Sequence, residues 1–261
     1  MKEKVENPWE KIKGPNYYTD NDEKTIKNFN DRLKKEGKED SPFYIDLRLM
    51  PEPYIGNKDA NVILLFTNPG LKKTELAEYD EYTEFYESLK NNLTHSNKDY
   101  PYYYFNPAFK KEIKGKEKYI AGAEWILKRT KELRKRLGND CLKILSKGIF
   151  TFQLHPYHSN KYKALPELEV GKYTEYLFKI AVERASKGNA IIICIRSYDQ
   201  WNKLYKKVFD TTNDFAGDLS DNFMLLKNKN DKTPRTPFFS ETLLRKNNFE
   251  RVVELLIRQS H

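Results

Sequence analysis

Four short apolar runs, each followed by a polar loop and an amphipathic segment, constrain the fold of this chain most strongly. The runs are "NVILLFT" at 61–67, "GIFTFQL" at 148–154, "AIIICI" at 190–195 and "NFMLLK" at 222–227. A continuous apolar run bounded by turn residues is typical of a strand that is buried on both faces of a parallel sheet. We therefore predict a three-layer α/β/α sandwich with a central, mainly parallel four-stranded sheet.

The segments between these runs are predicted to be largely helical. Apolar spacing and capping residues place helices at 23–35, 118–138, 171–188, 196–209 and 247–259. We expect a single domain over 1–261, in which 1–58, with its loop "MPEPYIGNKDA", is an N-terminal embellishment. The polar and aromatic stretch at 71–115 has no clean period, so we expect an insertion or a lid with its own short helices.

Composition argues against several classes of protein. No apolar run approaches the roughly 18 uncharged residues of a membrane span. The start "MKEKVENPWEKIKG" lacks the apolar region of a secretory signal, so we expect a soluble, cytoplasmic protein. Cys141 and Cys194 stand alone in apolar surroundings, which favours buried thiols over a disulfide framework. An iron–sulfur cluster needs about four cysteine ligands, so we expect no metal cluster.

The charge balance favours a polyanionic partner. Lysine and arginine number 47 against 38 aspartates and glutamates, which gives a net charge of +9. A basic surface attracts nucleic acid, so DNA, with single-stranded DNA as one option, is the expected partner; a lysine-rich coding bias is the alternative. The tract "YPYYYF", which ends at Phe105, could stack on bases or pack in the core, whereas Trp201 is expected in the core.

The loops that follow the four runs are the places to search for a site, because parallel sheets bind ligands where their strands end. The first loop holds Asn68, Pro69 and Gly70. The amide can bind a water or a substrate edge, proline stiffens the strand exit, and glycine lets a phosphate or another backbone approach. An ordinary strand-end turn explains the same tripeptide.

The second loop carries two histidines. His155 and His158 flank Tyr157, and Ser159 follows them. A His-x-x-His pair could bind zinc, but no third ligand of suitable type and spacing appears, so we expect no metal. Each histidine could act as a general acid, contact a phosphate or only form loop hydrogen bonds. Just before the loop, the amide of Gln153 could read a base edge or merely satisfy neighbouring backbone.

Arginines follow the third and fourth runs. Arg196 and Arg235 leave a strand end or its loop, where a guanidinium could bind phosphate bidentately. No Ser-His-Asp order, Walker loop or GxGxxG motif occurs, so acyl transfer, ATP hydrolysis and dinucleotide binding lose support. We expect no cofactor.

The order of these pieces resembles the uracil-DNA glycosylase superfamily over roughly residues 50–258. In its mismatch-specific and single-strand-selective branches, the motif after the first core strand runs Gly-x-Asn-Pro-Gly. Here "FTNPG" keeps Asn-Pro-Gly and has Phe66 in place of the leading glycine. The segment "TPRTP" looks like the Asn-Pro-Arg-Asn-Pro portion of the single-strand-selective branch, but the histidine of the family's His-Pro-Ser motif is missing.

The resemblance implies roles for several side chains. Asn68 would position the water that attacks C1′ of a flipped nucleotide, and Gly70 would leave room for the nucleotide backbone. Gln153 is the nearest match to the amide that recognises the base, while stabilisation of the oxocarbenium ion would fall to His155 or His158. The further candidate contacts are Pro69, Tyr157, Ser159 and Phe105 for the substrate, and Arg196, Arg235 and Thr236 for DNA phosphate.

The function that the resemblance implies is a DNA glycosylase. Such an enzyme hydrolyses the N-glycosidic bond of a damaged or modified, uracil-type base that is flipped out of DNA, and it needs no cofactor. One alternative is a catalytically inactive descendant that binds DNA or a protein through the same groove. Another is a hydrolase of free nucleosides, with 71–115 capping the site.

Overall fold

A computed structural model gives the conformation of most of the chain. It describes residues 5–12, 14, 17–38, 40–71, 83–113, 116–163, 165, 168, 171–226 and 239–260. Its main sheet is ordered β1-β5-β2-β6-β7. These strands are β1 (Tyr54–Gly56), β5 (Ile149–Gln153), β2 (Val62–Phe66), β6 (Ile191–Cys194) and β7 (Phe223–Leu225). All neighbours are parallel except β1, which runs antiparallel to β5.

The predicted α/β sandwich with a mainly parallel sheet is confirmed, but the predicted count of four strands is wrong. The fifth strand, β1, lies in the segment that was expected to be a loop. It has only three residues and follows Pro53, so it shows neither a strand-length apolar run nor an alternating pattern. All three of its residues are nevertheless buried at the edge of the sheet.

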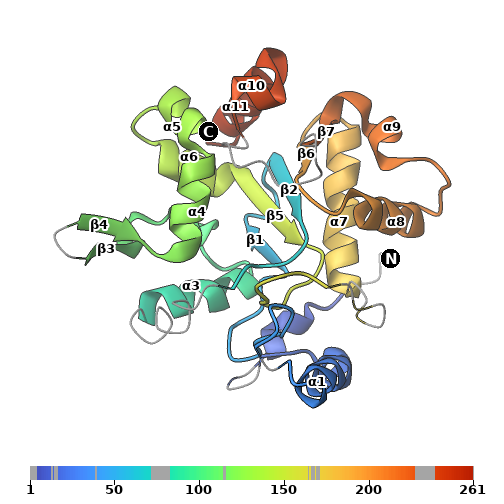
Figure 1. Cartoon of the computed structure of the whole chain (residues 1–261). Helices are drawn as coiled ribbons and strands as arrows, with labels where there is room; N and C mark the ends of the chain where they lie inside the picture. Colours follow the sequence, from blue (N-terminus) through green and yellow to red (C-terminus); the bar gives the residue numbers. More distant parts are fainter. Residues whose placement is uncertain are drawn as a thin grey trace.

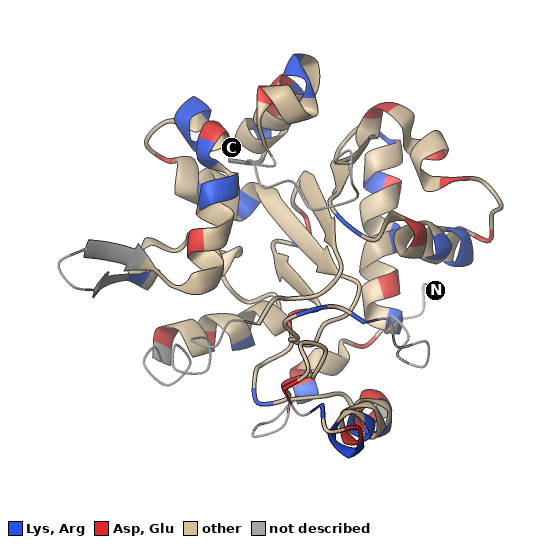
Figure 2. Ribbon diagram, viewed as in Figure 1, with Lys and Arg blue, Asp and Glu red and all other residues tan. Residues whose placement is uncertain are grey.

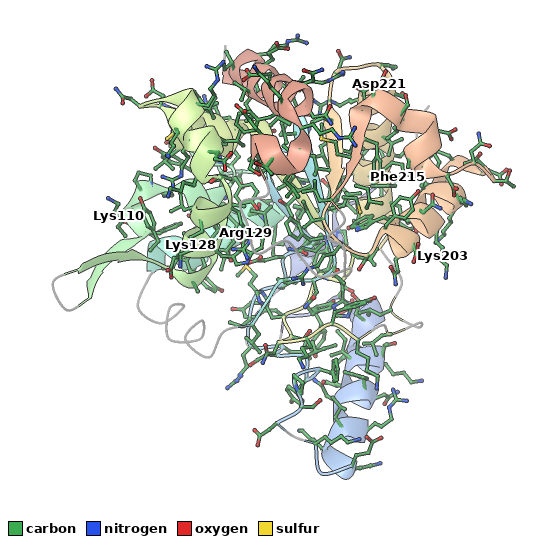
Figure 3. The ribbon with its side chains drawn as sticks, turned by 45° about the horizontal axis from the view of Figure 1, so that its top comes forward. Lys110, Lys128, Arg129, Lys203, Phe215 and Asp221 are labelled. Carbon is green, nitrogen blue, oxygen red and sulfur yellow. The ribbon has the colours of Figure 1, made fainter. Side chains whose placement is uncertain are left out.

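Two layers of helices enclose the sheet (Figure 1). One layer contains α5 (Lys131–Leu137), α6 (Cys141–Gly148), α10 (Glu241–Leu244) and α11 (Lys246–Ser260). The other contains α7 (Lys172–Ser186), α8 (Tyr198–Phe209) and α9 (Phe215–Leu219), with η4 (Ser220–Asn222) leading into β7. Phe215 is fully buried within this second layer (Figure 3).

The aromatic residue expected beneath a helix is found there. Trp201 of α8 is fully buried, and its Nε1 donates to the carbonyl of Phe66 over 3.1 Å. Cys194 is buried and Cys141 is half-buried, and both thiols are free. The expectation of two fully buried thiols therefore holds for Cys194 and is wrong for Cys141, which begins the first turn of α6. No helix in the described ranges is long and apolar enough to cross a membrane.

The N-terminal part contacts the sheet through its loops. It contains η1 (Pro8–Lys11) and α1 (Asp20–Lys35). Tyr157 donates to Asp22 Oδ2 over 2.5 Å, and Asp46 forms an isolated antiparallel bridge with His158. These contacts hold α1 beside the loop that follows β5, at the end of the sheet where parallel strands finish (Figure 1).

The segment between β2 and β5 contains several short elements. These are α3 (Thr83–Leu93), η2 (Tyr103–Phe105), η3 (Pro107–Phe109), the hairpin of β3 (Lys110–Ile113) and β4 (Lys116–Tyr119), and α4 (Ala121–Arg129). The single helix predicted at 118–138 is wrong, because that range contains β4, α4 and α5. Thr130 separates the two helices, and its Oγ1 bonds back to the carbonyl of Ile126 over 2.9 Å.

A cavity at the carboxyl ends of the strands

A cavity of about 300 Å³ opens where β2, β5 and β6 end. This volume is at the lower end of the range for small-molecule sites, roughly 300–1,000 Å³. Its wall combines polar side chains from the strand ends with aromatic side chains from η2 and α4. The sequence-predicted residues that line it are Asn68, Pro69, Gly70, Gln153, His158 and Arg196.

Asn68 is held in a fixed orientation by its own loop and by Ser159. Its Nδ2 donates to the Pro69 carbonyl over 2.8 Å, to Ser159 Oγ over 3.1 Å and to the Ser159 carbonyl over 3.3 Å. Because backbone carbonyls only accept, these contacts decide which end of the amide is nitrogen. Within the described ranges nothing donates to Asn68 Oδ1, so this acceptor is available to a ligand.

Gln153 offers a second acceptor. It is the last residue of β5, in register with Phe66, and its side chain is 7% exposed. Its Oε1 is buried and has no hydrogen-bond partner in the part of the chain that the structure describes. A buried polar atom without a partner costs roughly 1–3 kcal/mol, so this atom marks a place where a ligand or a water belongs.

Glu52 is a cavity residue that sequence reasoning missed. The residue is 3% exposed, and its Oε1 accepts from Tyr103 over 2.9 Å and from Tyr104 over 2.7 Å. Among the described residues, none donates to Oε2. In the sequence, a glutamate between two prolines is typical of an exposed loop, and no local pattern signals its burial.

His158 links two loops of the cavity wall. Its Nδ1 lies 2.8 Å from the Gly70 carbonyl and its Nε2 lies 3.0 Å from the Met50 carbonyl. Glu52 Oε1 lies 4.0 Å from the same Nε2. Because both nitrogens are occupied, this geometry supports a role in holding the Asn68–Gly70 loop in place.

Aromatic side chains form part of the cavity wall. Trp125 of α4 meets Phe66 edge to face, with ring centroids 5.6 Å apart. Tyr104 also lines the cavity, and Gly122 allows its close approach, since a Cβ at position 122 would lie 2.2 Å from the Tyr104 ring. Tyr102 shares a hydrogen bond of 3.0 Å with Thr151 Oγ1. A flat ligand with a polar edge matches such a wall.

Two arginines place positive charge beside the cavity. Arg196 contributes directly to its lining. The guanidinium of Arg129 lies 4.0 Å from the centroid of the Trp125 ring, on the side of α4 that faces the middle of the molecule (Figure 3). Burial, and then the nearby charge of Arg196, lowers the pKa of Arg129. Arg196 and Arg129 therefore place two positive charges close to each other beside the cavity.

The predicted catalytic residue His155 and the predicted substrate contacts Tyr157 and Phe105 do not line the cavity. His155 is 6% exposed and packs edge-on against Tyr157 and Tyr162, and burial lowers its pKa to about 4. Tyr157 points to Asp22 of α1, and Phe105 is fully buried beside Tyr102. His155, Tyr157 and Phe105 therefore pack within the protein and not against the cavity.

The remaining predicted site residues are Ser159, Arg235 and Thr236. Ser159 supports Asn68 and does not itself line the cavity, and its Oγ donates onward to the Lys161 carbonyl over 3.1 Å. The predicted phosphate contacts Arg235 and Thr236 lie outside the described residues. No group of three His, Cys, Asp or Glu side chains within the described ranges is arranged to hold a metal ion.

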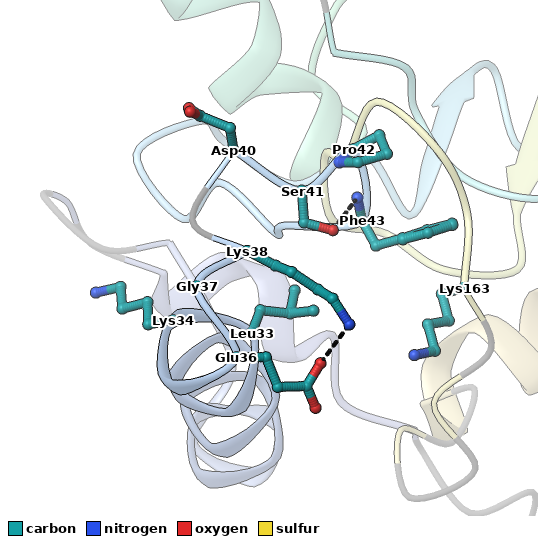
Figure 4. Close-up of a pocket in the computed structure, with 10 residues that line it drawn as sticks. All are labelled: Leu33, Lys34, Glu36, Gly37, Lys38, Asp40, Ser41, Pro42, Phe43 and Lys163. Atoms are coloured by element: carbon teal, nitrogen blue, oxygen red, sulfur yellow. Dashed lines mark hydrogen bonds and ion pairs between the residues drawn. The ribbon is translucent and has the colours of Figure 1, made fainter.

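A second hollow, of about 670 Å³, lies at the end of α1 (Figure 4). It shares no lining residue with the strand-end cavity. Its polar groups bond to each other: Lys38 donates to Glu36 over 2.8 Å, and the Phe43 amide donates to Ser41 Oγ over 3.3 Å. The strand-end cavity is therefore the better candidate for a specific ligand.

No protein-family model, curated protein or solved structure matches the chain. We therefore infer the candidate site from its geometry and charge alone. Figure 2 shows basic and acidic residues together on the outer helices. The strand-end cavity is where an aromatic wall, open acceptors and arginines come together.

Proposed function

We propose that the protein hydrolyses the N-glycosidic bond of a damaged or modified base that is flipped out of DNA. The observation that carries this proposal is the convergence of Asn68 and Gln153 on a cavity of about 300 Å³ with an aromatic wall. A flipped base needs a stacking face and polar groups at its edge, and both are present here. The resemblance of "FTNPG" to a glycosylase motif supports the same reaction.

Asn68 is the residue we propose to position the attacking water. With its Nδ2 bound to Ser159 and Pro69, Oδ1 is available to accept a hydrogen bond from that water. The water oxygen forms a bond to C1′ while the C1′–N bond breaks and its electron pair stays on the base nitrogen. The proton released by the water balances the proton gained by the base. Holding the water in place reduces the entropic cost of the attack.

Positive charge beside the cavity supports DNA as the substrate. Arg196 at the cavity and Arg129 next to it can contact phosphates on either side of a flipped nucleotide. The net charge of +9 adds a general attraction for nucleic acid. An isolated strand needs less energy to present an unpaired base, so we propose single-stranded DNA as the preferred form.

The test is release of a base from oligonucleotides that each carry one modified base, detected as abasic sites by alkaline strand cleavage. We expect Asn68→Ala to lower the rate by about 100-fold or more, the size of effect seen when a preorganised polar group is removed. Asn247→Ala is the matched control, because Asn247 is exposed on α11, away from the cavity. Absence of abasic sites with every substrate in a broad panel would contradict the proposal.

A catalytically inactive DNA-binding protein is the second candidate. It is favoured by Phe66, which stands in place of the family's glycine and packs against Trp125. It is also favoured by His155, which does not line the cavity. Such a protein would bind DNA in a salt-dependent manner, form no product and tolerate Asn68→Ala without loss of affinity.

A further inference from the structure

We infer that Glu52 and Gln153 form an acceptor pair that selects a base bearing an exocyclic amino group. This inference rests on the proposed function and specifies its substrate. It departs from the uracil-type base that the sequence resemblance implies, because uracil presents carbonyl oxygens on both sides of its single edge N–H group.

Glu52 is oriented by the phenols that bind it. Tyr103 and Tyr104 both donate to Oε1, so the carboxylate is fixed at one oxygen while no described residue donates to the other. A carboxylate oxygen accepts hydrogen bonds and cannot donate them. Since Glu52 lines the cavity and is 3% exposed, its Oε2 is an acceptor that a bound ligand can satisfy away from bulk water.

Gln153 supplies the second acceptor of the pair. The backbone N–H of Gln153 donates to the carbonyl of Pro53, the residue that follows Glu52, over 3.0 Å. Gln153 lines the same cavity, and its Oε1 is buried and lacks a partner within the described part of the chain. An amino group has two hydrogens and can therefore donate to two acceptors at once.

Bases with carbonyl edges fit these groups poorly. A carbonyl placed against Glu52 or Gln153 would bring two acceptors together and leave buried groups without donors. Glutamate pairs with the amino group of cytosine in protein–DNA complexes for the same reason. Cytosine and uracil form one matched pair that differs in this group, and adenine and hypoxanthine form another. The aromatic wall of Trp125 and Tyr104 accepts the flat face of any of them.

The experiment uses single-stranded oligo-dT that carries one dC, dU, dA or dI at its centre. Affinity is measured by competition against a labelled oligonucleotide, with fluorescence anisotropy as the readout. We expect dC to bind more tightly than dU, and dA more tightly than dI, by about 10-fold or more. Equal binding within both pairs, or preference for dU and dI, would overturn the inference.

Glu52→Gln is the diagnostic variant. The amide oxygen can still accept from Tyr103 and Tyr104, while its nitrogen places a donor where Oε2 was. We expect the preference for dC and dA to fall to within about twofold or to reverse. Glu84→Gln is the matched control, since Glu84 is exposed on α3 outside the cavity, and it should keep the full preference.

Folding of Glu52→Gln is checked by its thermal midpoint. If that variant does not fold, Gln153→Met replaces it, because methionine has a similar length and lacks the amide oxygen. The preference should then fall several-fold, and an unchanged preference would count against the pair. Release of uracil by the wild-type protein, without preference for amino-bearing bases, would overturn this inference and leave the proposed function intact. Failure of all four oligonucleotides to compete better than plain oligo-dT would overturn this inference, whereas the abasic-site assay decides the proposed function separately.

Discussion

At the scale of single residues, the cavity wall separates atoms that are already bonded from atoms that are open. Asn68 Nδ2 and Glu52 Oε1 are bonded within the protein, whereas Asn68 Oδ1, Glu52 Oε2 and Gln153 Oε1 receive no hydrogen bond from the described residues. Hydrogen bonds hold the other end of the Asn68 and Glu52 side chains in place, and a backbone hydrogen bond holds Gln153. Such preorganisation lowers the cost of arranging these groups when a ligand binds.

His155 makes a prediction about pH at the same scale. Burial lowers its pKa to about 4, against about 6.5 in an unfolded chain. Between these values the unfolded chain binds more protons than the folded one, so the free energy of unfolding falls as the pH falls from 6.5 to 4. The contribution at stake is on the order of 3 kcal/mol.

The measurement is urea denaturation of the wild type and His155→Phe at pH 7 and pH 5. Phenylalanine keeps a flat ring between Tyr157 and Tyr162 and cannot titrate. We expect the wild type to lose more stability than the variant between these two pH values. Equal losses would show that His155 does not carry this pH dependence. His95, whose pKa burial also lowers to about 4, is present in both proteins and does not affect the difference.

At the scale of elements, β1 forms one edge of the sheet, and its residue Ile55 lines the cavity. Gly56 has a φ of +108°, and a Cβ there would lie 2.4 Å from the carbonyl oxygen of Ile149 on the neighbouring segment. We expect Gly56→Ala to lower the free energy of unfolding by more than 2 kcal/mol, from backbone strain together with the clash. It should also weaken ligand binding, since Ile55 of this strand and Glu52 just before it line the cavity.

Gly188→Ala is the matched control for that change. Gly188 has a φ of +75°, and a Cβ there meets nothing within 4 Å. It carries the strain of a positive φ without a steric clash, so we expect a smaller loss, on the order of 1 kcal/mol. Denaturant titration of both variants gives the comparison. Similar losses in the two proteins would indicate that the approach of β1 to Ile149 contributes little.

The parallel part of the sheet could be predicted from sequence because each strand is a short apolar run between turn residues. Tyr54–Gly56 could not, because three residues next to a proline carry no periodic signal and are buried only by their neighbours. The sequence also does not predict that the helix is divided at Thr130 into α4 and α5, since the apolar spacing continues through both helices. Tertiary packing decides both cases.

The candidate site was predictable to a similar degree. Asn68, His158 and Arg196 follow predicted strands, and Gln153 lies near the end of one. Because the carboxyl ends of parallel strands share one edge, the gathering of these residues could be expected. Glu52 precedes the first long strand and reaches the cavity through the antiparallel β1, which no rule about strand ends covers. His155 could not be separated from His158, because the path of the loop decides which ring faces the cavity.

At the scale of the whole molecule, charge predicts how DNA binding depends on salt. If Arg196 contacts a phosphate, Arg196→Ala should weaken binding to single-stranded DNA for all sequences alike. It should also reduce the slope of log K against log salt by about 0.7. Arg258→Ala removes the same charge from an exposed position near the end of α11. Titrations at several salt concentrations compare the two variants, and equal slopes would argue against a specific contact at Arg196.

The position of α11 has a consequence for how the protein is made. This helix packs on α6 and reaches the start of β2, where Asn61 donates to the Leu255 carbonyl over 3.3 Å. Gly148 lies so close to Leu256 that a Cβ would come within 2.5 Å of it. During translation, the part of the α6 surface that packs on α11 therefore remains uncovered until residues 246–260 have been synthesised. We expect the nascent chain to depend on chaperones over that interval, since exposed apolar surface promotes aggregation.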